Sequence, residues 1–344
     1  MTGPTWSVIA GDCRTVLDGL PDEIAQTVVT SPPYWGLRDY GVDGQIGLED
    51  DPDDYVQALV DVFRSVRRVL RDDGTVWLNL GDTYAAKARG SDVGWDRSRL
   101  TNPGTQQKAQ AAALRSTGER HRGKSAGLKE KDLIGIPWMI AFALRADGWY
   151  LRSDVIWHKP NGMPESVRDR PTRAHEHIFL LSKRARYVYD ADAIREPDKG
   201  RDHPRTVFDG QPSLEPTGGL MAPHRGLRTP ASRDGTGANK RDVWTVTTKP
   251  YGGAHFAAFP PDLIEPCVLA GAPRGAIVLD PFAGAGTTGL VAVRHGRAFV
   301  GIELNAEYAA LARDRIATDI RLGHRPPRRD DDRPLQASLL EAGG

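Results

Sequence analysis

The chain has 344 residues, of which 39% are hydrophobic and 26% are charged, and its formal net charge is +1. This is the composition of a globular protein, and the length allows one large domain or a core with a smaller attachment. No apolar run approaches membrane-spanning length and no signal peptide is predicted, so we expect no membrane partner. Cys13 and Cys267 are the only cysteines, which excludes a disulfide framework and a cysteine-rich zinc site and makes a reducing cytoplasm the expected location.

Strands and helices alternate along most of the chain. Hydrophobic periodicity and turn residues predict, in chain order, strands at 6–12 and 27–31, a helix from Asp51-Pro52 to Asp73-Gly74, a strand at 75–80, a helix at 133–146, strands at 149–158 and 177–182, a helix at 262–270, a strand at 276–280, a helix at 287–295, a strand at 299–303 and a helix at 306–318. A helix that connects two strands implies a parallel pair. The predicted fold class is α/β, with a mostly parallel twisted sheet and helices on both faces.

Three stretches fall outside this alternation. Residues 84–132 are rich in Gly, Arg, Lys, Gln and Ser and predict a flexible basic insertion. Residues 184–250 show no sustained period and predict an irregular region, and residues 321–344 predict a disordered tail. The core is therefore expected in three parts, at 1–83, 133–183 and 251–320.

Charge is distributed unevenly along the chain. Residues 1–82 carry 6 basic and 15 acidic side chains, residues 84–132 carry 11 and 5, and residues 183–249 carry 13 and 9. Two basic blocks on a neutral chain are typical of segments that contact a polyanion. A solvated surface with loops gives the same counts, so charge alone leaves both interpretations open.

The segment from Val28 to Trp35 reads Val-Val-Thr-Ser-Pro-Pro-Tyr-Trp. It predicts a buried strand that ends at Pro32 and Pro33, neither of which can donate a backbone N–H. The Pro32 carbonyl and the Ser31 hydroxyl are then two acceptors beside the aromatic face of Tyr34. This combination suits a planar ring that carries an exocyclic amino group, as in cytosine or adenine. A plain Pro-Pro turn with core aromatics gives the same pattern.

A second motif lies at residues 277–289, Ile-Val-Leu-Asp-Pro-Phe-Ala-Gly-Ala-Gly-Thr-Thr-Gly. It predicts a strand, a Gly-rich turn and a helix, in which Gly284 and Gly286 let the backbone approach a ligand at the helix N-terminus. Glu303 follows at the end of the next strand, where a carboxylate can accept from both hydroxyls of a ribose. Asp280 opposes a pyrophosphate but suits the α-ammonium group of S-adenosylmethionine, which favours that methyl donor over NAD.

These motifs resemble those of the S-adenosylmethionine-dependent DNA amino-methyltransferases. Ser-Pro-Pro-Tyr at 31–34 is similar to their catalytic motif, and residues 280–288 are similar to their cofactor motif. Because the catalytic motif comes first, the chain resembles the circularly permuted β class. Further matching stretches are Gly11-Asp12, residues 157–164 and residues 255–260. The resemblance implies a Rossmann-like methyltransferase core, with residues 184–250 in the place of the target-recognition region.

The resemblance also implies roles for single residues. Asp12 would contact the adenine amino group of S-adenosylmethionine and Glu303 its ribose, while Phe259 would line the same pocket. The methionine end would be surrounded by Asp280, Gly284 and Thr287. Phe282 and Gly286 complete the predicted cofactor site, although plain core packing explains Phe259 and Phe282 equally well.

The implied activity is site-specific methylation of duplex DNA. The base would be flipped out and stacked on Tyr34, and the methyl group would pass in line to its amino nitrogen without a covalent enzyme intermediate. Ser31 at the first motif position resembles the cytosine-N4 type, whereas Asp or Asn there usually accompanies adenine N6. Cytosine is therefore favoured and adenine is the alternative. A cognate restriction endonuclease and a homodimer are further partners that the resemblance leaves open.

Other interpretations compete with this one. A nicotinamide oxidoreductase on the same scaffold leaves Ser31–Tyr34 unexplained, and a catalytically silent nucleic-acid-binding module would transfer no methyl group. Methylation of RNA or of a protein amide would use the same geometry. His175 and His177 share one face of a predicted strand, but they have no obvious third ligand, so no metal is expected and structural or phosphate-contacting roles are favoured.

Overall fold

The computed structural model describes residues 5–37, 39–85, 128–162, 164–197, 237–248 and 259–323. Most of the predicted insertion at 84–132, most of the region 184–250 and nearly all of the tail at 321–344 lie outside these residues. The expectations for those parts stay predictions. Within the described ranges, no helix is long and apolar enough to cross a membrane.

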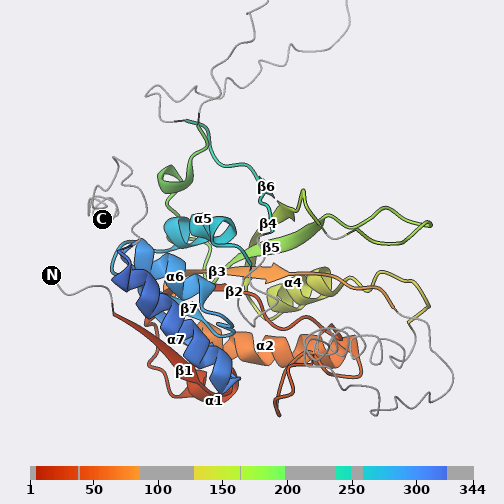
Figure 1. Cartoon of the computed structure of the whole chain (residues 1–344), viewed down its shortest axis with the longest axis horizontal. Helices are drawn as coiled ribbons and strands as arrows, with labels where there is room; N and C mark the ends of the chain where they lie inside the picture. Colours follow the sequence, from red (N-terminus) through yellow and green to blue (C-terminus); the bar gives the residue numbers. More distant parts are fainter. Residues whose placement is uncertain are drawn as a thin grey trace, which may run out of the picture.

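An eight-stranded sheet with the order β1-β8-β7-β2-β3-β5-β4-β6 forms the centre of the molecule (Figure 1). The strands are β1 (Trp6–Ala10), β2 (Ala25–Thr30), β3 (Leu70–Leu80), β4 (Tyr150–His158), β5 (His175–Ser182), β6 (Val243–Thr245), β7 (Ile277–Asp280) and β8 (Ala298–Glu303). Strands β1, β8, β7, β2 and β3 are parallel, β5 is antiparallel to β3 and β4, and β6 is parallel to β4. The predicted mostly parallel α/β sheet is confirmed.

Helices cover both faces of this sheet. The helices on one face are α1 (Cys13–Asp18), α2 (Pro52–Val69) and α4 (Ile136–Ala146), and those on the other are α5 (Pro261–Gly271), α6 (Thr287–Arg294) and α7 (Ala306–Arg321). Each group buries its own apolar core against the sheet, with Leu59 and Phe63 of α2 in one and Val268 and Ile316 in the other. The sheet is thus buried on both sides, as parallel sheets require.

Helix α2 shows how local sequence sets an element's limits. The Asp51 side chain accepts from the Asp53 backbone N–H at 2.8 Å, and Pro52 occupies the first helical position. The predicted end at Asp73-Gly74 is wrong, because the helix stops at Val69 and Leu70 begins β3. Leu70 is fully buried and pairs with Ala25 of β2, so burial in the sheet outweighs the helical periodicity.

Other elements also differ from the sequence prediction. Helix α1 was not predicted, and β5 begins at His175, two residues earlier than expected. Strand β6 lies in the region 184–250 that was expected to be irregular, where Trp244 is buried against Trp77 of β3. A strand of three residues is too short to show a period in the sequence, so its place is set by tertiary contacts.

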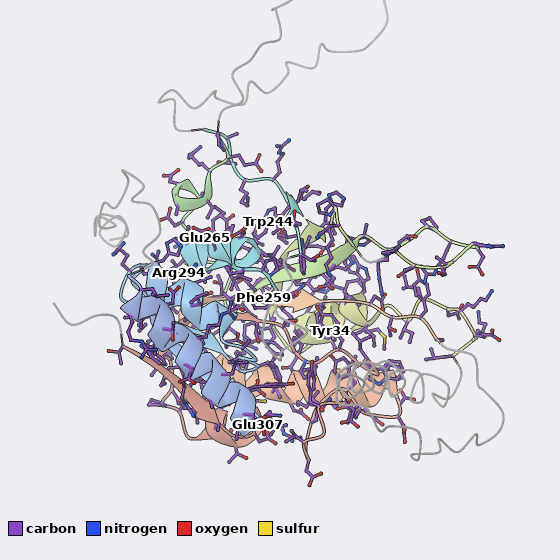
Figure 2. The ribbon with its side chains drawn as sticks, in the orientation of Figure 1. Tyr34, Trp244, Phe259, Glu265, Arg294 and Glu307 are labelled. Atoms are coloured by element: carbon purple, nitrogen blue, oxygen red, sulfur yellow. The ribbon has the colours of Figure 1, made fainter. Side chains whose placement is uncertain are left out.

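The position of β2 creates a crevice at one edge of the sheet. Strand β2 lies between β3 and β7, with Val28 opposite Leu279. The chain leaves β2 toward α2 on one face and leaves β7 toward α6 on the other. In open α/β sheets, ligands bind in the crevice that such a switch point opens at the carboxyl ends of the strands. Tyr34 and Phe259 lie near the middle of the molecule at this edge (Figure 2).

Candidate active site

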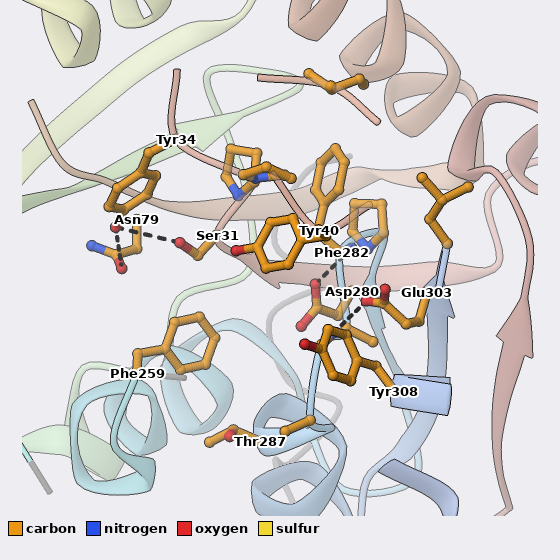
Figure 3. A pocket seen from close by; sticks show the side chains of 18 of the residues that line it. Ser31, Tyr34, Tyr40, Asn79, Phe259, Asp280, Phe282, Thr287, Glu303 and Tyr308 are labelled. Carbon is orange, nitrogen blue, oxygen red and sulfur yellow. Dashed lines mark hydrogen bonds between the residues drawn. The ribbon is translucent and has the colours of Figure 1, made fainter. Parts of the chain in front are cut away.

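A cavity of about 740 Å³ opens at the carboxyl ends of β2, β7 and β8 (Figure 3). Its walls include all but one of the residues predicted from the sequence to form the site, namely Asp12, Ser31, Pro32, Pro33, Tyr34, Phe259, Asp280, Phe282, Gly284, Thr287 and Glu303. The volume is in the range of pockets that hold drug-sized ligands. The two sequence motifs therefore share one cavity, although they lie far apart in the chain.

Asp280, the last residue of β7, is buried beneath this cavity. Its Oδ1 accepts from the Thr30 hydroxyl at 2.6 Å and from the Phe282 backbone N–H at 3.1 Å, and its Oδ2 accepts from the Thr288 hydroxyl at 2.7 Å. Burial raises the pKa of Asp280 to about 6, although these three hydrogen bonds act in the opposite direction. The carboxyl group is held rigidly and keeps acceptor capacity for a cation in the cavity.

Glu303, at the end of β8, ties the Gly-rich turn to the sheet. Its Oε2 accepts from the Gly284 backbone N–H at 2.8 Å, and its Oε1 accepts from the Asn305 backbone N–H at 2.9 Å. Burial raises the pKa of Glu303. Each oxygen keeps a second lone pair, so the carboxylate can still accept from a ligand's hydroxyl groups.

Gly286 is the predicted site residue that does not line the cavity. It precedes α6 with a φ of 74°, and a Cβ atom built there would lie 2.9 Å from the Cβ of Ala312 on α7. Its neighbours Ala285 and Thr287 line the cavity, and a ligand contact at the Gly286 backbone stays a prediction. Its lack of a side chain serves the contact between α6 and α7.

Replacing Gly286 with alanine should lower the free energy of unfolding by about 2–4 kcal/mol, since it adds overpacking to backbone strain. Gly275→Ala is the matched control, because Gly275 has a φ of 81° and no atom within 4 Å of the added Cβ. That control should cost only about 1–2 kcal/mol for the strain. Urea unfolding of both variants measures the difference, and equal losses would show that the contact with Ala312 has no energetic role.

Asp12 lies at the rim of the cavity and caps α1. It accepts from the Arg14 backbone N–H at 2.9 Å, and its carboxylate forms an ion pair with the Arg14 guanidinium. Arg14 also donates to the Gly44 carbonyl at 2.9 Å. The hydrogen bond from Arg14 lowers the pKa of Asp12. This side chain is therefore a fixed, ionised acceptor.

Aromatic rings complete this half of the cavity. The rings of Tyr40 and Tyr308 meet edge to face with centroids 6.3 Å apart, and both line the cavity with Phe282. Phe259 lies on the wall opposite Ser31 (Figure 3). The sequence analysis did not single out Tyr40 or Tyr308, because isolated tyrosines in a loop and in a first helical turn form no motif.

The other half of the cavity contains the Ser31–Tyr34 motif. The Pro33 carbonyl accepts from the Tyr55 hydroxyl at 2.7 Å, whereas no group among the described residues donates to the Pro32 carbonyl. The Ser31 and Tyr34 hydroxyl oxygens are 3.4 Å apart. Trp35 is buried and donates from Nε1 to a backbone carbonyl, so it anchors the turn in the core.

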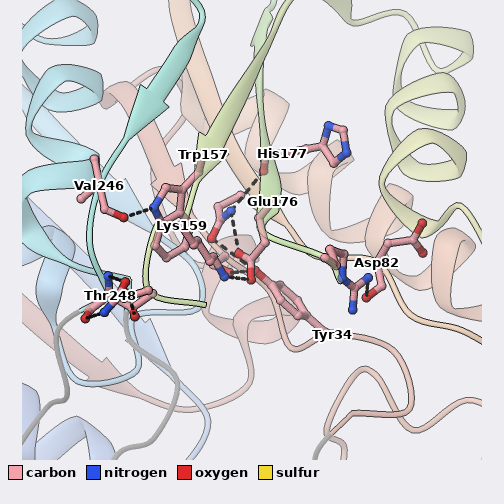
Figure 4. Close-up of polar contacts among 12 residues, drawn as sticks. Tyr34, Asp82, Trp157, Lys159, Glu176, His177, Val246 and Thr248 are labelled. Carbon is pink, nitrogen blue, oxygen red and sulfur yellow. Dashed lines mark hydrogen bonds and ion pairs between the residues drawn. The ribbon is translucent and has the colours of Figure 1, made fainter. Parts of the chain in front are cut away.

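Tyr34 is held by a polar cluster that the sequence analysis missed. Its hydroxyl donates to Glu176 Oε2 at 2.8 Å and lies 3.2 Å from Asn79 Oδ1 (Figure 4). Glu176 also forms an ion pair with Lys159, whose ammonium group lies 4.1 Å from the Trp157 ring centroid. Burial, followed by the Glu176 charge, raises the pKa of Tyr34 well above its usual value.

The metal interpretation of the two histidines finds no support. Within the described parts of the chain, no group of three potential ligands is close enough to hold an ion. His177 Nδ1 lies 3.0 Å from Asp154 of the neighbouring strand, and its ring stacks on Phe179. Strand alternation places Glu176 on the opposite face from these histidines, so it faces the cavity.

Comparison with known proteins identifies the family. Residues 25–314 match the family model described as DNA methylase, whose name covers N6 and N4 methyltransferases. The type II methyltransferase M.SmaI of Serratia marcescens is 48% identical over 309 residues, covering 90% of this chain and 90% of the relative. M.XycI of Xanthomonas campestris pv. cyanopsidis is 46% identical over 310 residues, covering 90% and 87%.

Solved structures share the fold. The PvuII DNA methyltransferase, named as cytosine-N4-specific, has a TM-score of 0.56 at 17% identity and covers 94% of this chain and 97% of its own. The putative DNA modification methylase TTHA0409 of Thermus thermophilus, solved with S-adenosyl-L-methionine, has a TM-score of 0.54 at 24% identity and covers 92% and 95%. The predicted Rossmann-like methyltransferase fold is confirmed.

The chain therefore belongs to the DNA methylase family of N6 and N4 amino-methyltransferases. Its methyl donor is S-adenosylmethionine, as the sequence predicted, and the nicotinamide oxidoreductase alternative is wrong. The cavity fits this cofactor chemically, because it offers Asp280 for an ammonium group, Glu303 for hydroxyl groups and aromatic walls for an adenine ring.

The raised pKa of Asp280 predicts a pH-dependent cofactor affinity. Binding of an ammonium group favours the ionised carboxylate, so affinity should rise about tenfold per pH unit below 6 and level off above about 6. Calorimetric titration with S-adenosylmethionine between pH 5 and pH 8 measures this dependence. The Asp280→Asn variant should lose it. An affinity that does not change across this range in the unmodified protein would show that Asp280 does not contact the cation.

Proposed function

We propose that the protein transfers a methyl group from S-adenosylmethionine to the exocyclic N4 of cytosine in duplex DNA. The observation that carries this proposal is the position of the Ser31 hydroxyl and the Pro32 carbonyl in the same cavity as Asp280 and Glu303. Two acceptors at one end and a cofactor site at the other suit the transfer of a group to a planar amine. Because the reaction joins two bound reactants, much of the acceleration comes from their orientation.

The amino nitrogen of a nucleobase is a weak nucleophile, because its lone pair is delocalised into the ring. Hydrogen bonds from its two N–H groups to Ser31 Oγ and to the Pro32 carbonyl favour the tetrahedral nitrogen that develops during transfer. The lone pair then points at the incoming methyl carbon. The nitrogen would attack the methyl carbon as the carbon–sulfur bond breaks, with S-adenosylhomocysteine as the leaving group, and the methylated nitrogen would release one proton to water to regain a neutral amine.

Cofactor roles follow from the same cavity. S-adenosylmethionine supplies an electrophilic methyl group when bound. Asp280 would hold its ammonium group, and Glu303 would accept from its ribose hydroxyls, next to Gly284 and Thr287. Asp12 would accept from the adenine amino group. The carboxylates of Asp12 and Glu303 are already fixed by hydrogen bonds, so these side chains would lose little conformational freedom when the cofactor binds.

A base-paired amino group lies inside the duplex, where these residues cannot reach it. The target base must therefore be flipped out into the cavity. The ring of Tyr34 would stack on it, and Phe259 would border it from the opposite wall. Basic side chains in residues 84–132 and 184–250 would hold phosphates, and the second region would read the base sequence in the major groove.

Cytosine is favoured over adenine by the residue at the first motif position. Ser31 presents a neutral hydroxyl group, as in the cytosine-N4 type that the motif resembles. The structural neighbour named as cytosine-N4-specific supports the same choice. The family model covers both N4 and N6 enzymes, so methylation of adenine N6 is the second candidate. We further propose that the protein is the modification enzyme of a type II restriction system, since the similar relatives are named type II methyltransferases.

Labelled S-adenosylmethionine offered with duplex DNA, RNA and protein tests the proposal. We expect label in duplex DNA alone, and nucleoside analysis of the digested product should show N4-methylcytosine. Appearance of N6-methyladenine would transfer the assignment to adenine. Label in RNA or protein, or no transfer at all, would contradict the proposed activity.

A further inference from the structure

A chain of hydrogen bonds runs from Ser31 into the protein, away from the cofactor half of the cavity. It joins Ser31, Tyr34, Asn79 and Glu176, and Lys159 closes its far end (Figures 3 and 4). We call these five residues the Tyr34 network. The Glu176 and Lys159 side chains are 16% and 18% exposed, so their ion pair is largely shielded from water.

The Glu176–Lys159 ion pair at the far end of the Tyr34 network determines which group donates in each hydrogen bond. Glu176 forms an ion pair with Lys159 through Oε1, and the second carboxylate oxygen, Oε2, can only accept. The Asn79 amide donates to Oε2 at 3.2 Å and to the His177 carbonyl at 3.1 Å. Both amide hydrogens are used, so Asn79 Oδ1 faces Tyr34 and can likewise only accept.

Tyr34 therefore has two acceptors on one side of its hydroxyl group and a single proton to give. That proton points toward Glu176 and Asn79, which leaves a lone pair of the Tyr34 oxygen facing Ser31. The Ser31 hydroxyl then donates to Tyr34, and its own lone pairs point into the cavity. The distance of 3.4 Å between these oxygens is long, as catalytic hydrogen bonds often are without substrate.

We propose that Glu176 is a positioning residue that makes Ser31 an acceptor for the amino group of the target base. It acts through Tyr34, by fixing the direction in which the hydroxyl groups of Tyr34 and Ser31 donate. This inference rests on the proposed function, in which Ser31 accepts from that amine. It also gives Tyr34 a second role, since its hydroxyl group matters in addition to the stacking of its ring.

The substitution Glu176→Gln should disturb this direction with little change in shape. The glutamine amide can donate to the Tyr34 oxygen, and Tyr34 can then donate to Ser31. Ser31 would in turn point its proton into the cavity, toward the N–H groups of the base. We expect the single-turnover rate of methyl transfer to fall about 10- to 100-fold, with the affinity for S-adenosylmethionine within about twofold of the original.

A double-mutant cycle with Tyr34→Phe separates positioning from general structural support. The phenylalanine ring can stack on the base but cannot relay a hydrogen bond, so Tyr34→Phe alone should also lower the rate about 10- to 100-fold. Adding Glu176→Gln in the Tyr34→Phe background should then lower the rate less than about threefold. Strong non-additivity of this kind is expected only if Glu176 acts through the tyrosine hydroxyl.

Glu265→Gln is the matched control. Glu265 lies on α5, pairs with His295 at 3.0 Å and is absent from the walls of the cavity (Figure 2). This variant should keep the original rate. Thermal unfolding and cofactor titration on every variant show that each one is folded.

Equal rate losses from Glu176→Gln in both backgrounds would overturn the inference, as would an unchanged rate in either Glu176→Gln or Tyr34→Phe. If Glu176→Gln does not fold, Tyr34→Phe alone still decides, because the inference requires its hydroxyl group for the rate. The base that the unmodified protein methylates tests the proposed function separately. A product methylated on adenine would refute the cytosine assignment. The double-mutant cycle would still test the role of Glu176, because its rates can be measured with either base.

Discussion

Replacing Ser31 with alanine should lower the single-turnover rate of methyl transfer about 100-fold, while the affinity for S-adenosylmethionine stays within about twofold. In the proposed reaction, Ser31 Oγ is one of the two acceptors for the amino group of the target base. Without it, one N–H group of the bound base is left without a partner in the cavity. The substitution removes more stabilisation from the tetrahedral nitrogen of the transition state than from the planar nitrogen of the ground state, so the rate falls.

The cofactor affinity should not change, because Ser31 lies in the other half of the cavity from Glu303 (Figure 3). Ser65→Ala is the matched control, since Ser65 is on α2 and its hydroxyl contacts Asp18 at the surface. Rapid-quench kinetics with duplex DNA and calorimetric titration with the cofactor measure both quantities. An undiminished rate in Ser31→Ala would remove Ser31 from the reaction.

The second large effect is expected for Asp280→Asn, which should weaken the binding of S-adenosylmethionine about 10- to 100-fold and make the ligand-free protein more stable. The binding loss follows from the missing negative charge beside the ammonium group. The stability gain follows from the pKa of about 6, which shows that the folded state disfavours the ionised carboxyl group.

The sign of the pH effect follows from the two pKa values. An aspartate pKa of about 6 in the folded state lies above the value of 3.8 for an exposed side chain, so the folded protein binds more protons between these limits. The free energy of unfolding of the ligand-free protein therefore falls as the pH rises above about 4. The contribution of Asp280 to this fall is at most about 3 kcal/mol. The Asp280→Asn variant does not lose this stability. Its free energy of unfolding should exceed that of the original protein at pH 8 and equal it at pH 3.

The hydrogen bonds of Asp280 can adapt to an asparagine. The carbonyl oxygen of the amide can accept from Thr30 and from the Phe282 N–H, as Oδ1 does now. Its NH₂ group can donate to the Thr288 hydroxyl, which can itself donate to the Val29 carbonyl 3.2 Å away. No buried polar group in this set of hydrogen bonds loses its partner, so the charge effect is measured without a packing defect.

Urea unfolding at several pH values and cofactor titration test both halves of this prediction. Asp61→Asn is the control, because Asp61 is exposed on α2 and pairs with surface side chains. A variant that binds the cofactor as tightly as the original would show that Asp280 does not contact the ammonium group. A variant that is less stable at pH 8 would contradict the cause assigned to the raised pKa.

The sequence was most informative where the chain leaves a buried strand. The diproline segment after β2 and the Gly-rich turn after β7 were recognised separately, and β2 and β7 are neighbours in the sheet. Their carboxyl ends must then share one edge, so the residues that follow both strands meet. That geometry explains why Ser31, Asp280 and Glu303, which local patterns singled out, line one cavity.

Residues whose role depends on distant contacts were not found. Asn79 lies near the end of β3 without a recognisable motif. Lys159 lies just after β4 in the matching stretch 157–164, for which no role was predicted, and the order of strands β3, β5 and β4 brings the two residues together. Glu176 lies between two histidines that suggested a metal site. The alternation of side chains along β5 places it on the opposite face from them, toward the cavity. The packing of Gly286 against Ala312 was not predicted, because Ala312 lies on another helix.

A crystal structure of the protein with S-adenosylhomocysteine and a duplex that contains its methylation site would test the central claim most directly. The account predicts a cytosine extruded into the cavity, with its N4 within hydrogen-bond distance of Ser31 Oγ and of the Pro32 carbonyl. The sulfur of the cofactor product should lie beyond that nitrogen, on the side of Asp280. A base that stays stacked in the duplex, or an amino group that meets neither acceptor, would contradict it.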